Sequence, residues 1–191
     1  MKNTKKSFTL VELLCAAALI VILAGIGFSA FSYASYRGKE AATKSLITRI
    51  AAGLETLKTK HGFYPAASSY SDIEITVNSS TGLITGIKFG TQTITDNAKL
   101  KDFLAAADGE NLKKYVSNDK LTDAWGGAIK YKYPGAVNKV KFDIIAPGAD
   151  GEFGTTAQSV PKDDKTTAKE MLDAYYYTNG EWACDDIANF Q

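Results

Sequence analysis

Residues 5–36 read K-K-S-F-T-L-V-E-L-L-C-A-A-A-L-I-V-I-L-A-G-I-G-F-S-A-F-S-Y-A-S-Y, with an acid at the start of a long apolar run. From Leu13 to Tyr36 no residue is charged, so the run predicts an apolar helix of about 36 Å, long enough to cross a bilayer core. Lysines precede the run, and lysines ahead of a first span keep that end in the cytoplasm. We therefore expect a single membrane pass, with the bulk of the chain exported.

A carboxylate, Glu12, stands at the start of this apolar run. Placing it in a membrane costs about 3 kcal/mol on insertion scales, so a neutralising group is needed. Three interpretations compete: a secretory signal cut near F-S-Y-A at 31–34, an uncleaved anchor, and a leader cut before the run. The third provides a partner for Glu12. Cleavage between Ser7 and Phe8 creates an α-amino group that can meet the carboxylate of a neighbouring copy shifted along the helix axis.

The stretch S-F-T-L-V-E at 7–12 resembles the cleavage and methylation motif of type IV pilins and type II secretion pseudopilins, normally Gly-Phe-Thr-Leu-x-Glu. The resemblance implies that a prepilin peptidase cuts before Phe8 and methylates its amine. It also implies that Phe8 and Glu12 serve subunit assembly, with the mature helices packed in the core of a helical homopolymer. Ser7 stands where the family has Gly, which keeps a small residue at the cleavage position.

The helix is expected to continue as an amphipathic half to residue 61. No proline occurs between 37 and 60, and Gly62 can provide a left-handed end before Pro65 prevents continuation. His61, the only histidine, is interpreted as a helix-end cation or a surface residue. The apolar positions with helical spacing are Leu46, Ile47, Ile50, Ala51, Leu54 and Leu57.

Alternating residues and turn signals predict the elements that follow the helix. They are a hairpin of strands 73–77 and 83–89, short helices at 100–107 and 112–116, strands at 129–133 and 140–145, and a hairpin in Y-Y-Y-T-N-G-E-W at 175–182. Strands packed against one helix face predict a pilin-like α+β fold: a long N-terminal helix on a small antiparallel β-sheet domain. The expected divisions are a leader over 1–7, a transmembrane or filament-core half over 8–36, an amphipathic half over 37–61, a connecting region over 62–122 and the sheet domain over 123–191.

Three further motifs resemble the core of major pseudopilins: D-A-W-G at 123–126, A-P-G-A-D-G at 146–151 and D-D-I-A-N-F at 185–190. Ala124 replaces the Pro of that family. The resemblance implies calcium binding by Asp150, Asp185 and Asp186, with the carbonyl of Pro147 as a helper. Residues 152–184 form an insertion that can either return the chain to this place or remove the site. The alternative is that these acids are simply turn and capping residues.

The resemblance implies a structural subunit of a type II secretion pseudopilus, in the bacterial inner membrane with its bulk in the periplasm. The implied partners are copies of itself, a prepilin peptidase, an assembly platform protein, minor pseudopilins and the membrane. The alternative in this class is a type IV pilin for adhesion, motility or DNA uptake. Lys+Arg total 22 and Asp+Glu total 21, which argues against a nucleic-acid partner. A second class of function, an anchored enzyme, lacks support because the sequence contains no phosphate-binding loop and no nucleophile elbow. A third class is a secreted binding module that carries a signal peptide.

Overall fold

The computed structural model describes residues 10–149, 151, 153–155, 158–159, 177–178, 181–182 and 187–189. The chain divides into two compact units, Met1–Gly38 and Lys39–Gln191. The helices are α1 (Leu10–His61), α2 (Asn97–Ala107) and α3 (Gly109–Lys113). The strands of the main sheet are β1 (Ala67–Val77), β2 (Ile84–Phe89), β3 (Gln92–Ile94), β4 (Val116–Ser117), β5 (Lys120–Leu121), β6 (Lys130–Tyr133), β7 (Asp143–Ala146) and β12 (Ile187–Ala188).

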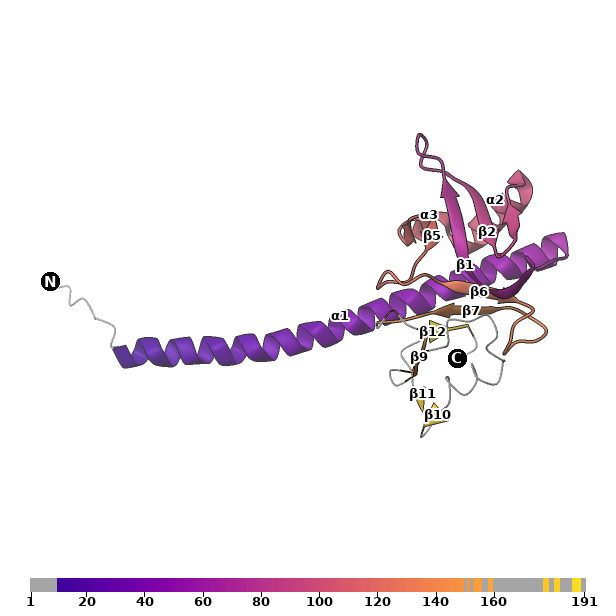
Figure 1. The fold of residues 1–191 in the computed structure, drawn as a ribbon. Coiled ribbons are helices and arrows are strands. Elements are labelled where there is room, and N and C mark those ends of the chain that lie inside the picture. The colour runs from indigo at the N-terminus through magenta and orange to yellow at the C-terminus, as the bar shows by residue number, and fades with distance from the viewer. Residues whose placement is uncertain are drawn as a thin grey trace. The chain divides into compact units, whose positions relative to one another are not determined.

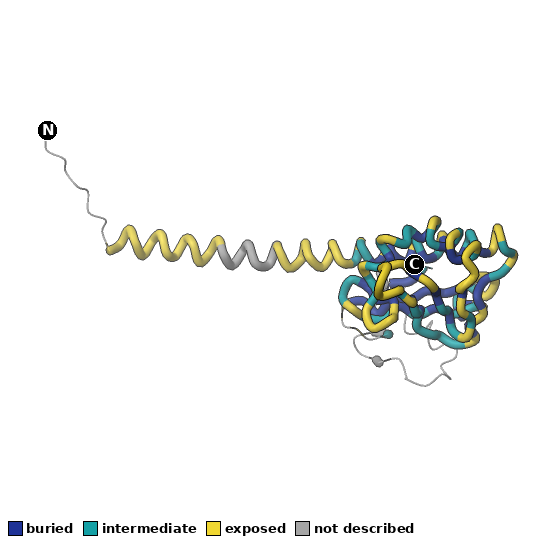
Figure 2. Tube along the Cα trace, turned by 90° about the horizontal axis from the view of Figure 1, so that it is seen from above, coloured by how far each residue is buried: buried dark blue, intermediate teal, exposed yellow. Residues whose placement is uncertain are grey.

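The first unit is helical wherever it is described, and its side chains there lie in the exposed class. Figure 2 shows this exposure along residues 10–23 and 31–38. Among the described residues, no helix combines the length and apolarity that a membrane crossing requires.

The second unit is built on an antiparallel sheet. Among the described residues its strands follow the order β12-β7-β6-β1-β2-β3, with β5 pairing β1 and β4 pairing β5. Two small hairpins lie outside this sheet, β8 (Gly154–Thr155) with β9 (Gln158–Ser159) and β10 (Tyr177–Thr178) with β11 (Glu181–Trp182). The β10–β11 pair confirms the strands expected on either side of Asn179-Gly180, while those two residues lie outside the described chain.

The second half of α1 passes along β1, β6 and β7, as Figure 1 shows. Its expected apolar stripe is confirmed, because Leu46, Ile47, Ile50, Leu54 and Leu57 are at most 3% exposed and Ala51 packs against the same core. Strands β1, β2, β6 and β7 contribute buried residues to the same core. These include Ile73, Ile75, Ile87, Phe89, Tyr131 and Ile144. The result is the pilin-like α+β architecture expected from the sequence.

Helix α1 ends where its sequence predicts. Gly62 adopts φ +81° and donates its N–H to the Lys58 carbonyl, which closes the last turn in the left-handed conformation. His61 Nε2 lies 3.0 Å from one Asp102 oxygen of α2, and Lys60 Nζ lies 2.7 Å from the other. The hydrogen bond from Lys60, followed by that from His61, lowers the pKa of Asp102. The cationic helix end is therefore a docking point for α2.

The helix expected over 112–116 is wrong. Helix α3 stops at Lys113, and Val116 begins β4, which pairs with β5. The cause is the two-residue connection, since Asn118 and Asp119 take φ of 50° and 61°. Positive φ at both positions suits a tight hairpin turn, and Asn and Asp tolerate it. Local turn chemistry therefore prevails over the apolar spacing.

The strand expected from Val140 begins only at Asp143. The carboxylate of Asp143 accepts the N–H groups of Val137 and Asn138 and so holds the preceding residues in a loop. Val140 is 88% exposed in that loop. A side chain three residues further along thus determines the backbone of this segment.

Candidate functional site

Glu12, the described residue among those expected to serve assembly, lies near the start of α1. Glu12 occupies the first described turn of the helix, where a carboxylate interacts favourably with the helix dipole, and it is exposed. Ser7 and Phe8, the expected cleavage and methylation residues, lie outside the described residues. Their roles and that of Glu12 in assembly therefore stay predictions.

Exposed apolar side chains surround Glu12 along the helix. Their exposed fractions run from 58% to 75% over Leu10, Val11, Leu13, Leu14, Leu19, Ile20, Val21, Ile22 and Leu23. Such a continuous apolar surface is unusual on a monomeric protein and marks a region that other molecules cover.

The expected calcium residues fall mostly outside the described chain. Asp150, Asp185 and Asp186 all lie outside the described residues. Of the four expected calcium ligands only Pro147 is described, and it is buried directly after β7. Within the described part of the chain, no three His, Cys, Asp or Glu side chains come together in a way that could hold a metal ion.

The closing motif is tied to the sheet by Asn189. Ile187, the first residue of β12, pairs with Ala146, the last residue of β7. The start of β12 therefore lies beside the end of β7. Asn189 Oδ1 accepts the N–H of Ile144 at 2.8 Å, and its Nδ2 donates to the Phe142 carbonyl at 3.1 Å. Sequence reasoning quoted this residue in D-D-I-A-N-F without assigning it a role.

Two buried carboxylates organise the turns of the sheet domain, and sequence reasoning missed what both do. Asp123 is 2% exposed and Asp143 is 0% exposed. Asp143 accepts the Tyr70 hydroxyl at 2.9 Å besides its two backbone N–H groups, and burial, followed by this carboxylate, raises the pKa of Tyr70. The available signal was an acid inside the apolar run F-D-I-I-A at 142–146, because a buried acid must be hydrogen-bonded.

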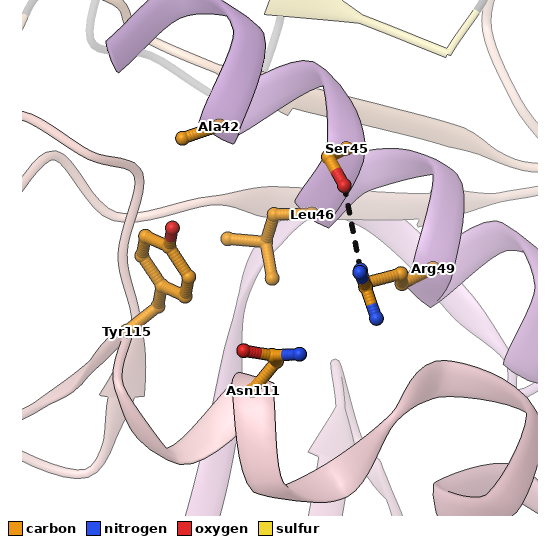
Figure 3. A pocket seen from close by; sticks show the side chains of 6 residues that line it. All are labelled: Ala42, Ser45, Leu46, Arg49, Asn111 and Tyr115. Atoms are coloured by element: carbon orange, nitrogen blue, oxygen red, sulfur yellow. Dashed lines mark hydrogen bonds between the residues drawn. The ribbon is translucent and has the colours of Figure 1, made fainter. Parts of the chain in front are cut away.

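A small hollow lies between α1 and α3, shown in Figure 3. Its volume is about 80 Å³. Its lining is Ala42, Ser45, Leu46 and Arg49 of α1 together with Asn111 and Tyr115. Arg49, the charged residue in this lining, is ion-paired with Asp108. A hydrogen bond from Asn111, and then the charge of Arg49, lowers the pKa of Asp108. The lining holds no nucleophile with an adjacent base, so it offers no catalytic arrangement.

A long helix whose described side chains are exposed in its apolar first half, and whose second half is buried on an antiparallel sheet, defines a pilin-like subunit. Residues 2–28 match the family described as Prokaryotic N-terminal methylation motif, and residues 95–163 match Type II secretion system (T2SS), protein G. The chain therefore belongs to the type II secretion protein G family, the major pseudopilins. No curated protein and no solved structure matches the chain.

These matches confirm the resemblance recognised from S-F-T-L-V-E and from the motifs of the sheet domain. The family consists of structural subunits rather than enzymes. Its members are processed by a prepilin peptidase and assemble into filaments.

Proposed function

We propose that residues 8–36 are held in the bacterial inner membrane, N-terminus in the cytoplasm, and then move into the core of a helical pseudopilus. One observation carries this proposal: the large apolar side chains of Leu10–Leu23 are more than half exposed. Burial of apolar surface contributes roughly 25 cal/mol per Å², so this helix gains free energy from any apolar surroundings. Lipid covers it before assembly, and neighbouring copies cover it afterwards.

Processing prepares the same helix for assembly. Cleavage between Ser7 and Phe8 releases an α-amino group four residues before Glu12, and the peptidase methylates it. The amine of one subunit then neutralises the Glu12 carboxylate of the next, which sets the axial shift between copies. An assembly platform protein and minor pseudopilins are the further partners of this step.

The mass of the mature N-terminus tests the processing step. Protein taken from its native membrane is digested, and its first peptide is analysed by mass spectrometry. We expect N-methylated Phe8 as the first residue. A chain that begins at Ser35 would instead indicate an ordinary secretory signal, and an intact Met1 would indicate an uncleaved anchor; either result contradicts the proposal.

Calcium is the proposed ligand of the sheet domain. The donors are the carboxylates of Asp150, Asp185 and Asp186 and the carbonyl of Pro147, and such hard oxygens are what Ca²⁺ prefers. The β12–β7 register supports the proposal, because Asp186 directly precedes Ile187 in sequence and Pro147 directly follows its partner Ala146. When bound, the ion would neutralise these acids and hold the closing motif to the turn after β7.

Thermal unfolding of the full chain in detergent tests the calcium proposal. A ligand that binds only the folded state stabilises it by about 2.7 kcal/mol at 100 times its dissociation constant. We expect calcium to raise the unfolding midpoint and EDTA to reverse the rise. Asp186→Asn should lose the shift, while Asp163→Asn, in the insertion, should keep it. An identical midpoint with calcium and with EDTA removes the proposal.

A further inference from the structure

The turn between β1 and β2 carries a sequence pattern that the proposed function does not use. Asn78-Ser79-Ser80 is the one place in the chain where an asparagine is followed two residues later by a serine or threonine. In exported proteins this spacing marks an acceptor for N-linked sugars, provided that the asparagine lies on an accessible surface loop. An asparagine inside a strand or a core does not meet that condition.

The turn is exposed along its whole length. Residues 78–83 all lie in the exposed class, between Val77, the last residue of β1, and Ile84, the first residue of β2. Figure 1 shows the turn projecting beyond the ends of these two strands, at the margin of the second unit. A modifying enzyme can therefore reach it while the sheet stays folded.

Backbone hydrogen bonds hold the turn in one conformation. The N–H of Asn78 donates to the Leu83 carbonyl at 2.8 Å, and the Asn78 carbonyl accepts the N–H of Gly82 at 2.8 Å. Gly82 takes φ +65°, a left-handed conformation that glycine adopts without strain. Asn78 is consequently fixed at the start of the turn.

The side chain of Asn78 is oriented by its oxygen, which leaves its nitrogen available. Oδ1 accepts the N–H of Ser80 at 2.9 Å and that of Thr81 at 3.1 Å, the hydrogen bonds of an Asx turn. Within the described part of the chain, neither Nδ2 of Asn78 nor the hydroxyl of Ser80 makes a hydrogen bond. The two groups that define the acceptor pattern are thus both exposed and both unengaged there.

We propose that Asn78 is an acceptor for N-linked glycosylation, with a glycosyl diphosphate as the sugar donor. In the transfer, Nδ2 forms a bond to the anomeric carbon of the sugar. The bond from that carbon to the diphosphate oxygen breaks, and its electron pair leaves with the diphosphate. The amide gives one proton to a base of the transferase, and the hydroxyl of Ser80 is the group by which the transferase recognises the acceptor.

Mass spectrometry of protein taken from its native membrane tests the proposal. Trypsin, which cleaves after Lys and Arg, releases residues 61–88, in which Asn78 is the only asparagine. We expect fragment ions that place a sugar on Asn78. The exposed Asn118, in the peptide 115–120, is followed two residues later by Lys120 and should be unmodified. An unmodified Asn78, or a sugar on a hydroxyl of residues 79–81 instead, overturns the proposal.

Three variants separate the transfer chemistry from the conformation of the turn. Asn78→Asp keeps an oxygen that accepts the N–H groups of Ser80 and Thr81 but removes the amide nitrogen, so the sugar should be lost completely. Ser80→Ala should lose the sugar as well, whereas Ser80→Thr retains a hydroxyl and should keep it. A sugar that persists in Asn78→Asp, or that disappears in Ser80→Thr, contradicts the assignment.

Two donors share this chemistry: a lipid-linked glycosyl diphosphate on the exported side of the membrane and a nucleotide sugar in the cytoplasm. In cells whose export is blocked, an unmodified chain indicates the lipid-linked donor and a modified chain indicates the nucleotide sugar; either result keeps Asn78 as the acceptor. The same digest contains the N-terminal peptide. A chain that begins at Phe8 and has an unmodified Asn78 overturns this inference and leaves the proposed function intact.

Discussion

The two halves of α1 belong to one helix but meet opposite surroundings. In the first half, apolar side chains such as Leu10, Val21 and Leu23 are 68% to 75% exposed. In the second half, Ile50, Leu54 and Leu57 are fully buried against the sheet. The second half finds its hydrophobic partners within its own chain. The first half exposes its large apolar side chains wherever they are described, and in the proposed assembly other molecules cover them.

The acids of the two regions differ in the same way. Asp123 and Asp143 are buried with several hydrogen-bond donors from their own chain, so they stabilise turns. Glu12 lies on an exposed apolar helix, and its proposed partner in assembly is the amine of another copy. A carboxylate thus serves folding in one region and, in the proposed assembly step, association in the other.

The largest expected effect breaks association without touching the fold. Glu12→Leu should abolish filaments, because the new N-terminal amine of the adjacent copy loses its counter-charge in an apolar core. Filaments are counted by electron microscopy after shearing, and the unfolding midpoint of the sheet domain should stay unchanged. Glu40→Gln on the same helix, where Glu40 bonds Lys44 one turn away at 2.7 Å, should still give filaments. Normal fibres from Glu12→Leu would contradict the proposed assembly step.

The next effect concerns folding alone. Asp143→Ala removes the acceptor of three donors, the Tyr70 hydroxyl and the N–H groups of Val137 and Asn138. Leaving buried donors without partners should lower the free energy of unfolding by about 3 kcal/mol. Urea denaturation measures the change. The exposed Asp119→Asn, which tolerates the left-handed backbone there, is the control and should change stability by less than about 0.5 kcal/mol.

The same substitution should have opposite signs at two glycines of α1, of which Gly38 belongs to the first compact unit and Gly53 to the second. At Gly53 an added Cβ lies 2.6 Å from the Phe103 ring, so Gly53→Ala should destabilise by about 1–3 kcal/mol. At Gly38 no atom lies within 4 Å of the added Cβ, so Gly38→Ala should stabilise by about 0.5–1 kcal/mol through helix propensity. Thermal unfolding followed by circular dichroism measures both, and equal signs would contradict the contrast between these two positions.

The smallest effect appears at alkaline pH and belongs to the second unit. Burial, and then the hydrogen bond to Glu55, raises the pKa of Tyr64 to about 12. The folded state therefore holds this proton more tightly than the unfolded state, in which the pKa is about 10. Its contribution to stability is complete below pH 10 and is lost as the pH rises toward 12, by about 1 kcal/mol near pH 11. In Tyr64→Phe the urea midpoint of unfolding should fall less between pH 10 and pH 12 than in the wild type. An equal fall in both proteins would contradict the raised pKa of Tyr64.

Sequence alone determined the elements whose cause is local. The charge-free run after Glu12, the apolar stripe from Leu46 to Leu57 and the stop at Gly62 each follow from spacing and backbone preference within one segment, and the structure confirms the helix, its stripe and its end. The motif at 7–12 indicated the pilin-like class for the same reason, since its chemistry is carried by adjacent residues.

Features that depend on contacts between distant segments became visible only in the folded chain. The late start of β7 follows from the hydrogen bonds of Asp143, and the approach of the turn at 147–148 to D-A-W-G-G follows from Asp123 and Gly127. Sequence spacing cannot reveal these contacts, because the sequence around a carboxylate in a strand or turn is the same whether its hydrogen-bond partner is water or a remote backbone N–H. A buried carboxylate must bond to the protein instead of water, and which carboxylates are buried depends on how α1 and the sheet pack together.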